Sequence, residues 1–126
     1  MSNILVTKKA REKLAKARAG ISNLSIIEGI ALGDGGVDQN GIPNELSFLD
    51  KNLKHELIRK PYNKKTEISD TSYRYSISLS ENELEGCDIN EMGLYDSDGD
   101  ILIIVTFSSK KKDGHIEMDF EIEDSF

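Results

Sequence analysis

An acidic run at residues 96–100, Asp-Ser-Asp-Gly-Asp, is the pattern in this sequence most typical of metal chemistry. In calcium loops, spaced acids precede a glycine at the sixth position and a glutamate at the twelfth. Here the glycine stands at the fourth position, and Phe107 would stand at the twelfth. An Asp-Gly pair between two apolar segments also predicts the tip of a β-hairpin, and we expect a hairpin turn rather than a metal site.

Residues 30–36, IALGDGG, place glycines directly after a predicted strand, as phosphate-binding loops do. A dinucleotide loop needs the spacing G-x-G-x-x-G opening into a helix, and a P-loop ends in Gly-Lys-Ser or Gly-Lys-Thr. This chain has neither arrangement. A structural turn is therefore the better interpretation of these glycines.

Histidine and cysteine are too few and too widely spaced to predict a catalytic or zinc centre. His55 and His115 lie far apart in the sequence, and Cys87 is the single cysteine. Zinc needs three or four convergent ligands, and a nucleophilic cysteine needs a base beside it. A pair of Cys87 with a histidine would be the sole nucleophilic candidate, but Cys87 follows a glycine in a polar stretch without the signature of an activated thiol. We expect no catalytic residue, no metal site and no cofactor.

Length and charge limit the class of protein. The 126 residues fit one domain, and a formal net charge of −7 argues against nucleic acid as the main partner. A single cysteine leaves no possibility of a disulfide within the chain. The longest apolar run, residues 101–105, is far shorter than the roughly 20 residues that cross a bilayer, so no membrane partner is expected.

Residues 7–19 predict a helix, with Thr7 as its N-cap and Gly20 as the residue that follows its end. An apolar stripe at helical spacing consists of Ala10, Leu14, Ala17 and Ile21. The remaining helix surface carries six cations, namely Lys8, Lys9, Arg11, Lys13, Lys16 and Arg18. Residues 113–126 carry six acids and no Lys or Arg, so the two ends of the chain are oppositely charged and could guide neighbours in an assembly.

Six further segments predict strands, through apolar alternation or apolar runs bounded by turn residues. They are residues 25–32, 53–59, 73–79, 91–95, 101–107 and 116–123. Residues 33–44 are too rich in Gly, Asp and Asn for regular structure, and the lysines 110–112 are expected in an exposed loop. The periodicity places Leu14, Ile30, Tyr75, Ile77, Ile103, Met118 and Phe120 in the core. The predicted fold is α+β, a mostly antiparallel sheet of about six strands with one N-terminal helix packed on it.

Four stretches in a fixed order suggest a family. They are residues 4–20 (ILVTKKAREKLAKARAG), 26–36 (IIEGIALGDGG), 42–63 (from Ile-Pro to ELIRKPYN) and 89–103 (INEMGLYDSDGDILI). Together they resemble the N-terminal domain of phage tail-collar fibre proteins, the part that joins a tail fibre to the baseplate. In this resemblance, the first stretch corresponds to an opening strand followed by an alanine-rich helix.

The resemblance implies a structural subunit of a phage or phage-tail-like bacteriocin baseplate, an adaptor for tail fibre or baseplate attachment that has no catalytic residues. It implies other tail or baseplate proteins as partners, and a homo-oligomer within the particle. Synthesis would be in the bacterial cytoplasm, and the final location would be the virion or the phage-tail-like particle. We expect residues 1–126 to be a single attachment-like domain without a fibre shaft. The alternative is a soluble module that binds a small ligand or carbohydrate through the glycine-rich loop.

Candidate contact residues lie on the basic helix and on the glycine-rich loop, because loops on a rigid sheet commonly carry binding. They are Lys9, Lys13, Lys16, Gly33, Asp34, Gly35 and Gly36. The three glycines are expected to give the loop the freedom for positive φ. The acidic segment of residues 116–123 is the next candidate.

Overall fold

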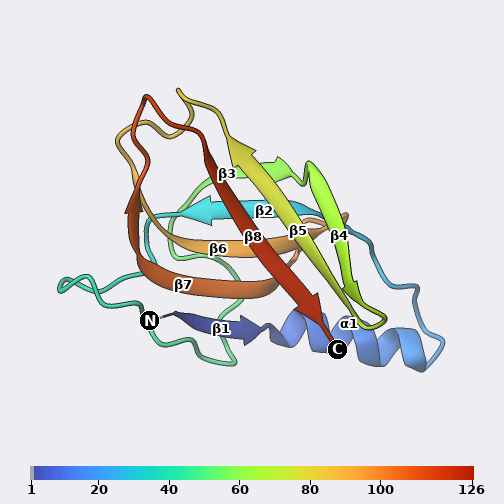
Figure 1. Ribbon diagram of the computed structural model, residues 1–126. Coiled ribbons are helices and arrows are strands. Elements are labelled where there is room, and N and C mark those ends of the chain that lie inside the picture. Colours follow the sequence, from blue (N-terminus) through green and yellow to red (C-terminus); the bar gives the residue numbers. More distant parts are fainter. Residues whose placement is uncertain (1) are drawn as a thin grey trace.

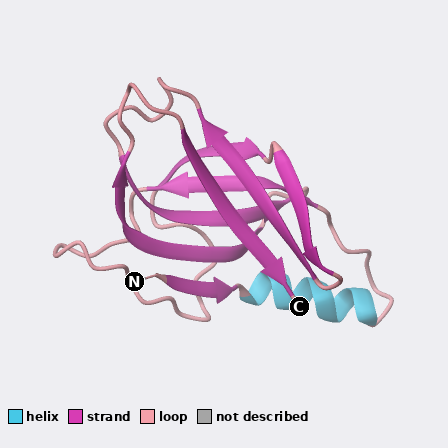
Figure 2. Ribbon diagram, in the orientation of Figure 1, coloured by secondary structure: helices cyan, strands magenta, loops and turns pink. Residues whose placement is uncertain are grey.

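Two antiparallel sheets of unequal size face each other across the main apolar core (Figure 1). The structure is a computed structural model that describes residues 2–126, and strands dominate it (Figure 2). The larger sheet has the strand order β1-β7-β6-β2-β3, and the smaller sheet has the order β4-β5-β8. The elements are β1 (Asn3–Val6), α1 (Lys8–Arg18), β2 (Ile27–Gly33), β3 (Glu56–Pro61), β4 (Lys64–Ser69), β5 (Ser72–Leu79), β6 (Asp88–Asp96), β7 (Ile101–Lys111) and β8 (Met118–Ser125).

The predicted α+β class is confirmed in outline, but the prediction of about six strands in one sheet is wrong, because the structure has eight strands in two sheets. The six predicted segments correspond to β2, β3, β5, β6, β7 and β8. Strand β1 is the opening strand that the family resemblance implied. The sequence pattern did not predict strand β4, because this strand has no apolar face and Thr66 is its single half-buried residue. Backbone pairing holds it to β5.

The main core is formed by the inward faces of both sheets. Ile77 of β5 and Phe120 of β8, from the smaller sheet, pack in one cluster with Ile30 of β2 and Ile103 of β7, from the larger sheet. These four predicted core residues are buried, as is Tyr75, whereas Met118 and Leu14 are half-buried. Alternation therefore predicted the core of the strands correctly, and the helical stripe does not reach it.

The larger sheet is covered on its other face as well, by the segment that connects β2 to β3. Leu53 of that segment packs with Ala31, Tyr95 and Ile104, all buried. This second cluster explains why residues 101–105 are apolar on both faces, as predicted. The Thr106 hydroxyl fixes the segment by donating to the Asn44 carbonyl at 2.8 Å.

The helix α1 lies beyond the end of β1, along the edge of the larger sheet (Figure 1), and has no buried residue. The sequence predicted a helix packed on the sheet, but the helix does not cover a sheet face (Figure 1). Both predicted ends are confirmed. Thr7 Oγ1 accepts the Ala10 N–H at 3.2 Å and donates to the Ile101 carbonyl at 2.8 Å, which ties the helix start to β7. Gly20 has φ +75° at the C-terminal end, where a left-handed residue stops a helix.

The lysine run at residues 110–112 is not the exposed loop that the sequence predicted. Lys110 and Lys111 end strand β7 and are exposed, but Lys112 is fully buried. Its ammonium donates to the Glu81 carbonyl at 2.8 Å and to the Asp113 carbonyl at 3.0 Å. Three consecutive lysines therefore have two different environments, since two are exposed and one is buried. Only the tertiary contacts distinguish them.

Candidate interaction surfaces

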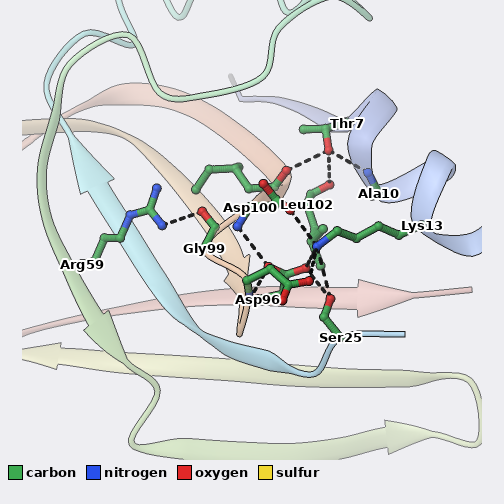
Figure 3. Close-up of polar contacts among 11 residues, drawn as sticks. Thr7, Ala10, Lys13, Ser25, Arg59, Asp96, Gly99, Asp100 and Leu102 are labelled. Carbon is green, nitrogen blue, oxygen red and sulfur yellow. Dashed lines mark hydrogen bonds and ion pairs between the residues drawn. The ribbon is translucent and has the colours of Figure 1, made fainter. Parts of the chain in front are cut away.

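One lysine of α1 is bound inside the molecule rather than presented to a neighbour. The Lys13 ammonium contacts the carboxylates of Asp96, of Asp98 at 3.0 Å and of Asp100 at 2.7 Å (Figure 3). These aspartates form the turn between β6 and β7. Asp96 is fully buried and also accepts a hydrogen bond from the Ser25 hydroxyl. The contact joins the helix, the hairpin and the segment that precedes β2.

Both partners hold their charges in this contact. Burial by itself raises the pKa of Asp96, but hydrogen bonds from Lys13, Ser25 and the backbone N–H of Asp100 outweigh burial, so the pKa lies below its usual value. Burial lowers the pKa of Lys13, but hydrogen bonds to Asp100, Asp96 and Asp98 raise it to a net value above the usual one. Asp96 therefore stabilises the fold above its ordinary pKa and loses this contribution as the pH falls, while Lys13 loses its contribution as the pH rises above its ordinary pKa.

The same three aspartates are the group that could hold a cation, since one ligand atom from each lies within 4.8 Å of the others. The Lys13 ammonium lies among them and supplies one positive charge to the cluster. A metal ion would have to displace it. The predicted hairpin turn is confirmed: Gly99 has φ +85°, and its N–H donates to the Asp96 carbonyl at 2.9 Å.

The other two helix lysines predicted to contact neighbours are differently placed. Lys9 and Lys16 are exposed, and neither forms an ion pair within residues 2–126. The Lys13 side chain is only 17% exposed. A partner could therefore reach Lys9 and Lys16 without breaking an internal contact, whereas it could not reach the charge of Lys13.

The glycine-rich loop, residues 33–36, is held by two buried side chains of β6. The Glu91 carboxylate accepts the backbone N–H groups of Gly35 at 2.9 Å, Lys54 at 2.8 Å and His55 at 2.9 Å. The side-chain oxygen of Asn90 accepts the N–H of Gly36 at 2.7 Å. Clustered backbone donors of this kind are what a bound phosphate would need. Here a carboxylate of the chain itself occupies them.

Close packing, and not backbone conformation, explains the glycines of this loop. None of Gly33, Gly35 and Gly36 has a positive φ, so the expectation of left-handed backbone is wrong. A Cβ on Gly33 would lie 2.4 Å from the His55 carbonyl oxygen, and a Cβ on Gly36 would lie 2.2 Å from the Asn90 carbonyl oxygen. Any side chain would force the loop away from β6 and from the segment before β3.

The histidines and the cysteine serve separate parts of the surface. The His55 imidazole contacts the Asp34 carboxylate, and this hydrogen bond raises the pKa of His55. His115 is exposed and Cys87 is half-buried. Within residues 2–126, no hydrogen bond joins the side chains of these three residues to one another. Asp34, a predicted contact residue, is therefore engaged with a neighbour in its own chain.

The acidic strand β8 lies at an edge of the smaller sheet and pairs with β5 alone. Phe120 and Ile122 point into the core and are buried, while Asp119, Glu121 and Glu123 alternate with them and are exposed. Such a row of carboxylates discourages unplanned pairing of an edge strand. The strand predicted at residues 116–123 is confirmed from Met118 onward, whereas Ile116 lies before β8 and is exposed.

An apolar groove of about 660 Å³ lies between the C-terminal end of β8 and the β1–α1 edge of the larger sheet. Its apolar lining includes Ile4, Val6, Ala10, Leu14, Leu24 and Ile27. The side chain of Ile4 is 66% exposed and that of Val6 is 40% exposed. This groove had no signal in the sequence, because its residues come from four separate segments.

Comparison with known proteins gives one family. The model of the family described as phage tail-collar fibre protein, N-terminal, matches residues 1–119. The chain belongs to this family. No curated protein and no solved structure matches the chain. The tail-collar fibre family is a family of phage tail structural proteins and is not a known enzyme family, so membership indicates a structural role in the tail and a place in the virion. No helix within residues 2–126 has the length and apolar character to cross a membrane.

The four stretches that resemble the tail-collar fibre domain all belong to the larger sheet or its covering segment. Residues 4–20 form β1 and α1, and residues 26–36 form β2 and the glycine-rich loop. Residues 42–63 run under the sheet into β3, and residues 89–103 form the β6–β7 hairpin. The strands of the smaller sheet lie outside these stretches.

Replacing Lys13 by methionine should lower the free energy of unfolding by about 2 kcal/mol, because Asp96 would be left buried without its ionic partner. Lys16→Met, on the same helix but exposed, is the matched control and should change stability by about 0.5 kcal/mol or less. Urea denaturation of both variants measures the difference. Equal stabilities would show that the Lys13 contact does not hold the helix.

Replacing Gly36 by alanine should cost about 2–3 kcal/mol, because its Cβ would collide with backbone that cannot move aside. Gly41→Ala is the control: Gly41 has φ +77° but open space around it, so the change should cost only about 1 kcal/mol of backbone strain. Thermal and urea unfolding compare the two variants. A Gly36 variant as stable as the Gly41 variant would mean that the loop is not packed on β6.

Proposed function

We propose that this tail-collar fibre domain is an adaptor of a phage or phage-tail-like bacteriocin particle, which joins a tail fibre to the baseplate and acts through protein contacts alone. Its partners would be other tail or baseplate proteins, together with further copies of the same chain. The observation that carries the proposal is the family match, which extends over residues 1–119 of 126.

The geometry supports a role in contacts rather than in chemistry, because the motifs that could bind ions are used inside the fold. The aspartates of the hairpin bind Lys13, and the donors of the glycine-rich loop bind Glu91. The groups exposed to neighbours are lysines of α1, the apolar groove and the carboxylates of β8. Of these carboxylates, Glu121 and Glu123 lie near Arg74, and Asp119 accepts a hydrogen bond from Ser78. These are features of an interaction surface.

The alternative of a small-ligand module is less well supported by the structure. A ligand at the glycine-rich loop would have to compete with the Glu91 carboxylate and the Asn90 side chain for the N–H groups of Gly35 and Gly36. The loop also packs too closely on its surroundings for a ligand to enter beneath it.

The double variant Lys9→Glu with Lys16→Glu tests the helix as a docking surface. Docking on an acidic neighbour should weaken by about tenfold or more, since each reversed surface contact costs up to about 1 kcal/mol. The variant should stay folded, because neither lysine forms an ion pair in the described part of the chain, residues 2–126. The measurement is the amount of this chain, relative to a major tail protein, in purified particles.

The matched control is Lys64→Glu with Lys65→Glu, which makes the same charge change on β4, at the edge of the smaller sheet opposite β8. We expect this control to be incorporated normally. Equal incorporation of both double variants would remove the helix from the interface. Particles that form and function without the chain would overturn the structural role itself.

A further inference from the structure

The two sheets do not match in width, and the mismatch is confined to one side of the molecule. Five strands face three, so part of the larger sheet has no strand opposite it. On one side Lys60 of β3 closes the gap, because its ammonium donates to the Ser78 carbonyl of β5 at 2.7 Å. On the other side, Phe107 of β7 packs on Phe120 of β8, and β1 lies beyond β7, past β8, which is the last strand of the smaller sheet within residues 2–126.

The uncovered strand β1 presents core-like side chains to this gap. Ile4 and Val6 pair in register with Val105 and Ile103, and cross-strand partners point to the same face of a sheet. Val105 and Ile103 are buried in the main core, so Ile4 and Val6 point to the inner face of the larger sheet. Both are nevertheless exposed to solvent in the apolar groove. The groove is therefore the unfilled end of the space between the sheets.

The free edge of β8 borders the same groove. The sheet order β4-β5-β8 ends at β8, which leaves its outer backbone groups unpaired by any strand within residues 2–126. One more strand on this edge would lie opposite β1 and would cover Ile4 and Val6. A strand added to β1 instead would widen the larger sheet and leave the mismatch in place.

From this geometry we infer that the β8 edge accepts an extended segment of another tail protein as a fourth strand of the smaller sheet, and that this segment alternates apolar residues with lysine or arginine. Its apolar residues would point inward onto Ile4 and Val6. Its basic residues would point outward beside Asp119, Glu121 and Glu123. Strand addition of this kind combines main-chain hydrogen bonds with side-chain selectivity. The identity of the partner as a tail protein rests on the proposed function, whereas the strand site does not.

The net charge on and around β8 selects this occupant. Arg74 of β5 lies 3.8 Å from Glu121 and 3.5 Å from Glu123, so one cation faces three carboxylates on this surface and the surface remains acidic. Opposite charges on neighbouring strands stabilise a sheet, and like charges directly opposite each other destabilise it. Pairing of β8 with β8 of a second copy would set carboxylates against carboxylates, which disfavours the same chain as the occupant. Within residues 2–126, no strand alternates apolar residues with basic ones, so a strand of a second copy would not fit either.

A carboxylate at the groove end marks one inward position where the incoming segment could carry a basic residue instead of an apolar one. Asp124 follows Phe120 and Ile122 on the inner face of β8 and lines the groove. Its carboxylate forms no ion pair or hydrogen bond within residues 2–126, and burial raises its pKa. Because Asp124 lies on the inner face, the outward-pointing basic residues of an incoming strand would not reach it, and only a basic residue at the one inward position beside Asp124 would relieve the cost of this desolvated charge.

The test uses the full chain and a synthetic peptide in which valine and lysine alternate, with a valine–glutamate peptide as the control. Titration followed by backbone amide NMR should show binding of the lysine peptide, with shifts in β8 and β1. The glutamate peptide should bind about tenfold more weakly or worse, since several cross-strand pairs change sign. The variant Glu121→Lys with Glu123→Lys should reverse the preference, and Lys64→Glu with Lys65→Glu should leave it unchanged.

Two further peptides separate strand addition from simple charge attraction. Methylating the backbone nitrogens of alternate residues blocks one edge of the peptide and retains every charge. One of the two alternate sets should abolish binding and the other should be tolerated, because a docked strand bonds to β8 along a single edge. Any other pattern overturns the strand site, including equal binding by both methylated peptides, equal binding by the glutamate peptide, shifts confined to other elements, or self-association of the chain through β8. Such a failure would leave the adaptor proposal intact, because incorporation into particles is measured separately.

Discussion

The unequal widths of the two sheets are the constraint on which the rest of this structure depends. A three-stranded sheet can cover the inner face of only part of a five-stranded one, so the core is complete under β5 and β8 and incomplete over β1. The helix α1 does not fill this gap: it lies along the edge of the larger sheet and has no buried residue (Figure 1). The helix is instead fixed at its start by Thr7 on β7 and along its length by Lys13 on the β6–β7 turn. The side next to β1, where the space between the two sheets is open, is the open side of this sandwich. It is bordered by fixed elements, although no strand within residues 2–126 fills it.

Buried carboxylates provide the polar contacts that hold this frame. Asp96 connects the helix, the hairpin and the segment before β2. Glu91 connects the glycine-rich loop to the start of β3. A buried carboxylate is stable only when donors surround it, so each one fixes several segments at once. Residues that look like a cation site and an anion loop therefore act as internal ties. Partners can therefore contact only the remaining exposed surface. This agrees with a structural role, as expected for the family to which the chain belongs.

Local patterns predicted the parts of the fold that depend on neighbouring residues. The caps of α1, the Asp-Gly turn and the alternation of β5 and β8 are set within a few positions of the chain, and each is confirmed. The division into two sheets was not predictable in this way, because it depends on which strand edges pair. Strand β4 is an edge strand of the smaller sheet that carries lysines, and it has no apolar face by which the sequence could predict it.

The candidate site shows the same limit. The sequence showed that Lys9, Lys13 and Lys16 share a helix, but the different role of Lys13 depends on aspartates more than eighty positions away. The glycines of the loop were noticed for the wrong reason, since the collision that excludes a side chain comes from Asn90 and His55 rather than from φ. The burial of Lys112 at the end of a run of three lysines, the first two of which are exposed, is also a tertiary effect. Patterns of residue type located the important segments, and packing decided what each side chain does.

Hydrogen–deuterium exchange of the chain, compared between its free form and assembled tail particles, tests the central claim that the open side of the sandwich is where the particle docks. We expect backbone amides of β8 and β1 to exchange more slowly in the particle, while the glycine-rich loop and the β6–β7 turn, already bonded internally, change little. Unchanged exchange in β8 and β1, or new protection confined to β3 and β4 on the closed side, would contradict this claim.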